Sequence, residues 1–143
     1  MSKKKLKAAI PEGWRSICPI TNTLDLLGDK WTLIVIRDLF LGKHTYGEFQ
    51  VSPEGIPTNI LAARLKRLLE SDLIEKEAYQ ERPVRYAYSL TDKGKTLAPI
   101  VKEIVKWGLS NIPGTDDRLA KDYLKKKKSL KRKGAQRKEL GDK

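Results

Sequence analysis

The chain has 143 residues and a hydrophobic fraction of 39%, so it can bury a core of its own and is not expected to be disordered throughout. No apolar run reaches the ~18 residues that a membrane span needs, and no apolar signal region follows the basic start, so we expect a cytoplasmic protein without a membrane partner. One cysteine, Cys18, and one histidine, His44, can form neither an intramolecular disulfide nor a zinc site between them, and we expect no metal or cofactor.

The net charge of +12 is concentrated at the two ends of the chain. Residues 118–143 hold 12 Lys/Arg against 3 Asp/Glu, residues 1–9 carry a charge of +4, and residues 10–117 are left with −1. We therefore expect a flexible basic arm over 1–13, a folded domain over 14–114, and a flexible or partly helical basic tail over 115–143. Such a tail either attracts nucleic acid without reading its sequence or keeps the chain soluble.

Two helices are predicted at the start of the folded part. Pro19 suits a first helical position and Gly28 a helix end, with Ile20, Leu24 and Leu27 on one face between them. A second helix is predicted from about Asp29, as its cap, to Leu41. The side chains expected on its buried side are Trp31, Ile34, Val35 and Leu39.

The next segment predicts a short helix, a turn and an amphipathic helix. The short helix lies within 44–49, the turn is formed by 52–55, and the amphipathic helix ends near Ser71. Its apolar stripe consists of Leu61, Leu65, Leu68 and Leu69. The opposite face carries Asn59, Ala63, Lys66 and Glu70, with Arg67 beside it and Arg64 flanking the apolar side. This face either is merely solvated or enters a DNA major groove, where Asn, Lys and Ala can contact base edges.

The pattern then changes from helix to strand. Strands are predicted over 74–81 and 84–90, joined by a hairpin with Arg82 and Arg85 around its tip, which is the wing of a winged helix-turn-helix. Beyond it, Thr91 is expected to cap a single long helix that is kinked at Pro99 and ends at Pro113. The apolar face of that helix consists of Leu97, Ile100, Val101, Ile104, Val105 and Leu109, with Trp107 near its end.

Four stretches together resemble the HxlR-type transcriptional regulators, a branch of the MarR-like winged helices. They are Cys18-Pro19-Ile20 with Leu27-Gly28-Asp29-Lys30-Trp31-Thr32-Leu33-Ile34, then Thr45-Tyr46-Gly47-Glu48-Phe49, then Gly55-Ile56 with Leu61-Ala62-Ala63-Arg64-Leu65-Lys66-Arg67-Leu68, and finally Arg82-Pro83-Val84-Arg85-Tyr86-Ala87-Tyr88-Ser89-Leu90-Thr91-Asp92-Lys93-Gly94. The resemblance covers roughly residues 16–108. Pro57, Asn59 and Ser71-Asp72 depart from the residues usual in the family.

The resemblance implies an α+β, mainly helical fold: a winged helix-turn-helix with a two-stranded wing and extra N- and C-terminal dimerisation helices. It implies a homodimer that binds double-stranded DNA in a sequence-specific way and regulates transcription. The expected DNA-binding residues are Thr58, Asn59, Ala62, Ala63, Lys66, Arg67, Arg82 and Arg85. The expected dimer interface consists of Ile20, Leu24, Leu27, Ile100, Ile104 and Trp107.

Three questions stay open at the level of sequence. Some members of the family sense oxidants or electrophiles through a cysteine at the position of Cys18, so this residue is either a reactive thiol or a packed side chain. An effector, a small molecule or an oxidant, would act there or in a pocket lined by Trp31 and Trp107, which otherwise pack in the core or in the dimer interface. No residue set suggests an enzyme. The competing function is a general nucleic-acid binder, architectural or RNA-associated, that acts through its basic tails.

Overall fold

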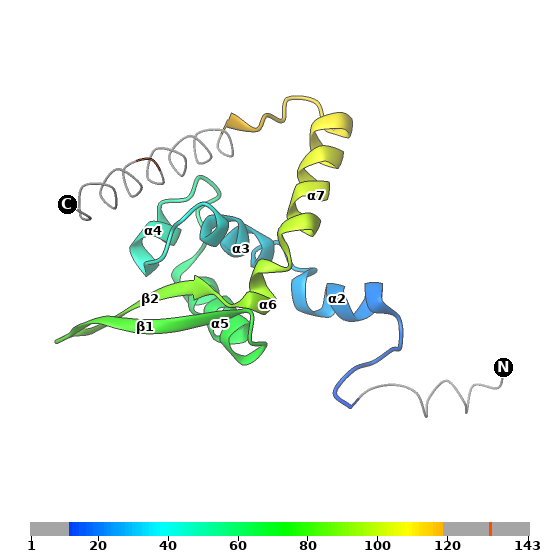
Figure 1. The fold of residues 1–143 in the computed structure, drawn as a ribbon. Helices are drawn as coiled ribbons and strands as arrows, with labels where there is room; N and C mark the ends of the chain where they lie inside the picture. Colours follow the sequence, from blue (N-terminus) through cyan, green and yellow to red (C-terminus); the bar gives the residue numbers. More distant parts are fainter. Residues whose placement is uncertain (1–11, 119–131, 133–143) are drawn as a thin grey trace, which may run out of the picture.

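The computed structural model describes residues 12–118 and residue 132 (Figure 1). The expected basic arm over 1–13 and the tail over 115–143 therefore lie mostly outside the described residues. In chain order the elements are α2 (Pro19–Leu27), α3 (Thr32–Phe40), α4 (Tyr46–Gln50), α5 (Thr58–Glu70), β1 (Ile74–Glu81), β2 (Val84–Leu90), α6 (Asp92–Lys95) and α7 (Ala98–Asn111). Within the described part of the chain, no helix is long and apolar enough to cross a membrane.

The core lies between α3, α4 and α5, and the start of the hairpin closes it. Most of the apolar stripe predicted for α5 is buried there: Leu61, Leu65 and Leu68 are all at most 2% exposed, whereas Leu69 is half-buried. The remaining buried apolar side chains are Leu27, Val35, Ile36, Leu39, Phe49, Ile56, Leu73 and Ile74. Burial of these side chains is the main force that holds the helices together.

The first two helices follow the prediction in position but not in detail. α2 spans Pro19–Leu27, and Gly28 caps its end, as predicted. α3 begins at Thr32, later than expected, because the Asp29 carboxylate accepts the backbone N–H groups of Trp31 at 2.9 Å and Thr32 at 3.0 Å and so caps the helix from a distance. Its predicted buried side was partly wrong: Ile36 and Asp38 are buried, whereas Trp31 and Ile34 are only half-buried.

The short helix α4 begins with a capping box. The Thr45 hydroxyl accepts the backbone N–H of Glu48, and the Glu48 carboxylate accepts the backbone N–H of Thr45. The turn after α4 contains Gly55, whose φ of +65° lies in the left-handed region that glycine adopts without strain. These two local features set the direction in which α5 leaves the turn.

The two strands have the predicted bounds and form an antiparallel hairpin that projects from the helical body (Figure 1). Ile74 pairs with Leu90 at its base and Glu81 with Val84 at its tip, with an irregularity in register between Ala78 and Gln80. The opposite side of β2 pairs with the segment before α4, through a bridge between Thr45 and Ala87 and a 2.8 Å hydrogen bond from Tyr88 N–H to the His44 carbonyl. The wing is thereby connected to the helix-turn-helix.

The prediction of a single kinked helix after the wing is wrong. The chain instead forms a one-turn helix, α6, capped by Thr91, and a separate helix, α7, with Pro99 as its second residue. Proline lacks an N–H and its ring clashes with the carbonyl four residues earlier, so Pro99 is tolerated in a first helical turn and not in a helix interior. The first helix therefore ends at Lys95, and α7 begins at Ala98 with Pro99 in its first turn.

Candidate DNA interface

The N-terminus of α5 is held by side chains of α4. The Tyr46 hydroxyl donates to the Thr58 carbonyl at 2.5 Å, and the Gln50 amide donates to the Thr58 hydroxyl at 3.2 Å. Pro57 precedes the helix and supplies no side-chain cap, so these bonds are what connect the first turn of α5 to the helix before it. Two helices held in this way form the helix-turn-helix unit.

A buried carboxylate supports the turn between α4 and α5 from below. Asp38 is 1% exposed, and its carboxylate accepts Arg37 Nη2 at 2.9 Å and the hydroxyl of Ser52 in the turn. Lys43 Nζ donates to Ser52 Oγ at 2.7 Å, and Arg37 Nη1 reaches Glu54 Oε1 at 2.5 Å on the far side of the turn. The hydrogen bond and charge of Arg37 lower the pKa of Glu54. This network connects the end of α3 to both arms of the turn.

The outward face of α5 carries small and polar side chains. Thr58, Asn59, Ala62, Ala63 and Lys66 are all exposed, opposite the buried leucine stripe. Within the described part of the chain, the side chains of Asn59 and Lys66 have no hydrogen-bond or ion-pair partner. An exposed helix face with small side chains near its start and unpaired polar groups can approach base edges closely.

Two arginines of α5 lie on its inner flank. Arg64 Nε donates to Asp29 Oδ1 at 2.9 Å, and Arg67 Nη2 donates to the backbone carbonyl of Asp25 in α2. Partial burial by itself raises the pKa of Asp29, but hydrogen bonds from Thr32, from the Trp31 N–H and from Arg64 outweigh it and hold that pKa far below its ordinary range. Arg67 thus lies apart from the other predicted α5 residues, half-buried against α2.

The wing presents two cations at its tip. Arg82 and Arg85 are exposed and, among the described residues, make no ion pair. Further toward the base, Lys76 Nζ lies 4.3 Å from the centroid of the Tyr86 ring, close enough for a cation–π contact between the strands. Arg82 and Arg85 therefore place two cations at the end of the hairpin, next to the exposed Glu81.

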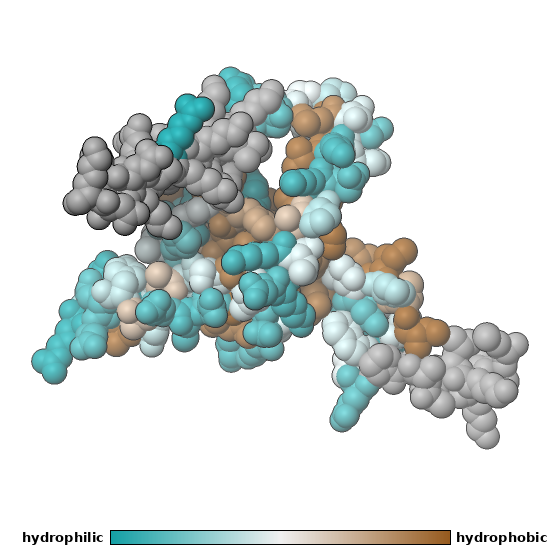
Figure 2. Space-filling view, in the orientation of Figure 1, coloured by the Kyte–Doolittle hydropathy of each residue, from teal (hydrophilic) through white to brown (hydrophobic). Residues whose placement is uncertain are grey.

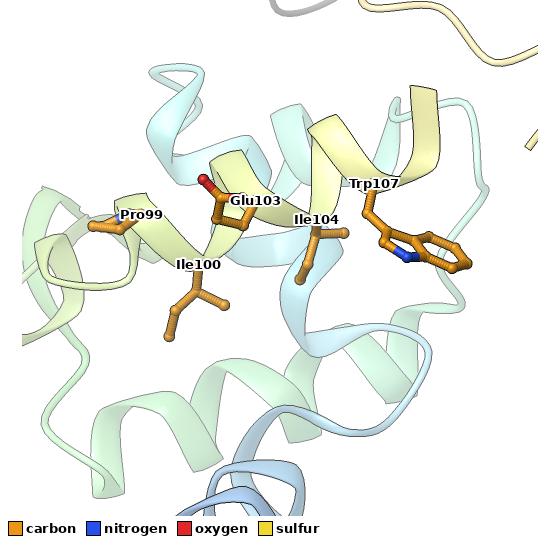
Figure 3. A pocket seen from close by; sticks show the side chains of 5 residues that line it. All are labelled: Pro99, Ile100, Glu103, Ile104 and Trp107. Carbon is orange, nitrogen blue, oxygen red and sulfur yellow. The ribbon is translucent and has the colours of Figure 1, made fainter. Parts of the chain in front are cut away.

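A second surface is apolar and lies on α2 and α7. Ile20 and Leu24 of α2 are 71% and 57% exposed, and Trp107 of α7 is 64% exposed. Figure 2 shows hydrophobic surface over both helices, and Figure 3 shows Ile100, Ile104 and Trp107 side by side along α7, where they line a hollow with Pro99 and Glu103. Leu27, expected in the same interface, is 5% exposed and belongs to the core of the protomer.

Cys18 is the residue immediately before α2 and is half-buried. Hydrogen bonds from the Thr21 backbone N–H and then the Thr21 hydroxyl, together with the Ile20 N–H, lower the pKa of its thiol. His44 Nδ1 lies 2.9 Å from the Tyr88 carbonyl and belongs to the base of the wing. Among the described residues, no group of three or more His, Cys, Asp or Glu side chains could hold a metal ion.

Three features that position the site are not predicted from the sequence. Thr45 and Glu48 have the spacing of a capping box, which could have been read directly. Asp38 follows Val35 by three residues and precedes Leu39, so its place on the buried face was also visible in the spacing. The partners of Arg64 and Arg67 lie in a different helix, and no local pattern indicates them.

The exposed face of α5, its connection to α4 and the two-stranded wing define the class of protein: a winged helix-turn-helix DNA-binding protein. A model of the HxlR-like helix-turn-helix family matches residues 26–116. The chain belongs to this family of transcriptional regulators. The prediction from sequence is thereby confirmed for the family and for the fold class. The members of this family are regulators of transcription and not enzymes.

Relatives and solved structures agree with this assignment. The HTH-type transcriptional regulator YybR of Bacillus subtilis is 36% identical over 111 residues, which cover 78% of this chain and 86% of YybR. The structure of PA1607, a putative transcription factor, matches with a TM-score of 0.64 and 37% identity over 72% of each chain. The redox regulator HypR in its oxidized form matches with a TM-score of 0.61 and 35% identity, over 70% of this chain and all of HypR.

Proposed function

We propose that this protein is a homodimeric, sequence-specific regulator that binds an inverted-repeat operator through α5, with the wing on the flanking DNA. The observation that carries the proposal is the outward face of α5, where Asn59, Ala63 and Lys66 are exposed beside one another and have no partner within the described residues. Asn pairs with adenine, Lys with guanine or phosphate, and the Ala methyl contacts thymine. The exposed Arg82 and Arg85 are placed to contact phosphates or a narrow minor groove.

The test is selection of random DNA by the wild type and by Asn59→Ala. One good bidentate base contact contributes about 1–3 kcal/mol, so Asn59→Ala should relax the preference at one base position in each half-site. Glu70→Ala, at the far end of the same exposed face, serves as the matched control and should enrich the wild-type motif. Identical motifs from wild type and Asn59→Ala would remove Asn59 from the readout.

The dimer is proposed from the apolar faces of α2 and α7. Exposed groups of this size on a small domain mark an interaction surface, and a two-fold interface would cover Ile20 and Leu24 together with Ile104 and Trp107. Sedimentation at micromolar concentration should give a dimer for the wild type and a monomer for Leu24→Glu combined with Trp107→Ser. A wild-type monomer would contradict the proposal.

A response to oxidants or electrophiles through Cys18 is the finer part of the proposal. The support is the lowered pKa of the thiol at the start of α2, next to the exposed Ile20, and the likeness to HypR, which is described as a redox regulator. Oxidation of two Cys18 thiols from two protomers by hydrogen peroxide would form one disulfide and two waters. Cys18→Ser should bind DNA normally and lose any response to the oxidant, whereas an unchanged response would leave Cys18 a packing residue.

The alternative is a binder without sequence preference that acts through its basic ends. Deletion of residues 118–143 removes a net charge of +9 and should weaken binding to all DNA while flattening its salt dependence. The selected motif should survive this deletion if α5 reads the sequence. Loss of the motif together with the tail would favour the alternative.

A further inference from the structure

The helix that carries the proposed dimer contacts is weakly embedded in its own protomer. Leu27 is the one residue of α2 that is fully buried against the described part of the chain, and Leu26 is partly buried beside it. The exposed side of α2 carries Ile20 and Leu24. A helix held by so few apolar contacts depends on other interactions for its orientation.

Those other interactions come from α5. Arg67 donates to the carbonyl of Asp25 within the last turn of α2, and Arg64 donates to Asp29, the second residue after α2 ends. Both arginines are half-buried, and the Arg64 and Asp29 side chains are 25% and 22% exposed. Charge-assisted hydrogen bonds at such partly desolvated sites are stronger than those between fully exposed groups.

Both arginines bind close to the short junction between α2 and α3. A Cβ on Gly28 would lie 2.4 Å from the Leu24 carbonyl oxygen, so the chain turns closely between α2 and α3. Asp29 at this junction also accepts the N–H groups that begin α3. The two arginines therefore connect α5 to the end of α2 and to the start of α3.

We propose that Arg64 and Arg67 are positioning residues that fix the angle between α5 and α2 and thereby set the half-site separation that this protein accepts. The inference rests on the dimer proposed above: if α2 packs on the partner subunit, the angle between α2 and α5 decides how far apart the two α5 helices lie. From the sequence, Arg67 is expected to contact DNA and Arg64 to flank the apolar side of α5; in the structure both guanidinium groups donate hydrogen bonds within the protomer.

The experiment measures spacing separately from base preference. The wild type is presented with a DNA library in which the two selected half-sites are separated by every length within three base pairs of the preferred one. We expect the wild type to favour one separation over its neighbours by about tenfold, and Arg64→Ala combined with Arg67→Ala to reduce that factor to about threefold or less. The base motif within each half-site should remain that of the wild type.

Two control variants distinguish an effect on the orientation of α5 from the loss of a positive charge and from a general weakening of the contacts of α2. Lys66→Ala removes an exposed cation from the same helix and should lower affinity at every separation while keeping the spacing preference. Arg15→Ala removes the 2.9 Å ion pair with the Asp25 carboxylate and leaves the carbonyl that Arg67 uses, so it should also keep the preference. Thermal unfolding by circular dichroism confirms that each variant is folded, and Arg64→Gln and Arg67→Gln, taken singly, replace the double variant if it does not fold.

A distance measurement gives a readout without DNA. In a Cys18→Ser background, Glu70→Cys places one spin label at the exposed end of α5 in each protomer. The wild-type arginines should give one narrow distance distribution between the two labels, and the Arg64/Arg67 variants a broad one. A double variant that keeps both the tenfold spacing preference and the narrow distribution overturns this inference alone. A wild type that binds only single half-sites overturns the inference and the proposed dimer together.

Discussion

Replacement of the buried Asp38 by Asn tests whether the network beneath the turn holds the helix-turn-helix together. Asp38 accepts Arg37 Nη2 at 2.9 Å and Arg37 Nε at 3.1 Å, accepts the Ser52 hydroxyl, and lies 3.7 Å from Lys43 Nζ. Loss of one member of a buried ion pair typically costs about 3–5 kcal/mol when the remaining charge is trapped. Here the Arg37 and Lys43 side chains are 25% and 26% exposed and can reach water. We therefore expect Asp38→Asn to cost about 2–3 kcal/mol.

Urea unfolding followed by circular dichroism measures this loss as a shift in midpoint at constant slope. For a domain of this size, the loss corresponds to a fall in Tm of about 10–20 °C. Glu54→Gln is the matched control, because the Glu54 side chain is 34% exposed and its pair with Arg37 should contribute less than about 1 kcal/mol. Equal losses in the two variants, or a loss below about 1 kcal/mol for Asp38→Asn, would refute the reasoning.

Three further predictions concern positions where backbone or charge is constrained. A Cβ on Gly94 would lie 2.0 Å from the Leu73 carbonyl oxygen, so Gly94→Ala should force α6 away from the base of the wing and lower the melting temperature by several degrees, as calorimetry would show. Asp72 has a φ of +57°, so Asp72→Gly should be more stable than Asp72→Ala by about 1 kcal/mol in urea unfolding, and equal midpoints would contradict the strain. Because the pKa of Asp29 is lower in the folded chain than its ordinary value of about 3.9, its contribution is complete above that pH and is lost as the pH falls below it. Asp29→Asn should therefore be less stable than the wild type at pH 7 and show a shallower loss between pH 4 and 2, measured as Tm against pH.

The wing was predictable from the sequence because its signals are local. Alternation over 84–90 and the position of Pro83, which cannot donate to a strand ladder, place both strands and the loop between them, and the structure has the same bounds. The leucine stripe of α5 was equally readable, since its period of 3–4 residues persists over roughly two turns. These elements depend on neighbours in sequence more than on distant partners.

The failures have the opposite cause. The helix after the wing has apolar residues at helical spacing on both sides of Pro99, and that continuity favoured one kinked helix over the two that form. A helical wheel also gives no sign that Arg67, beside the exposed face of α5, donates to the Asp25 carbonyl in α2. Periodicity assigns a residue to a face of its own helix and cannot say which other helix covers the border of that face.

The hairpin also has an outer edge that the helices leave open. β1 pairs with β2 on one side only, and among the described residues no further strand pairs with its other side. Unpaired N–H and C=O groups along an edge strand invite pairing with the same edge of another molecule. β1 carries exposed Glu75, Lys76, Glu77 and Glu81 along this edge, and the irregular register between Ala78 and Gln80 interrupts its regularity. A second copy of β1 that paired with this edge would place its own charged side chains next to these and would meet an interrupted hydrogen-bond pattern. The wing can therefore project into solvent without joining the wings of other copies into a continuous sheet.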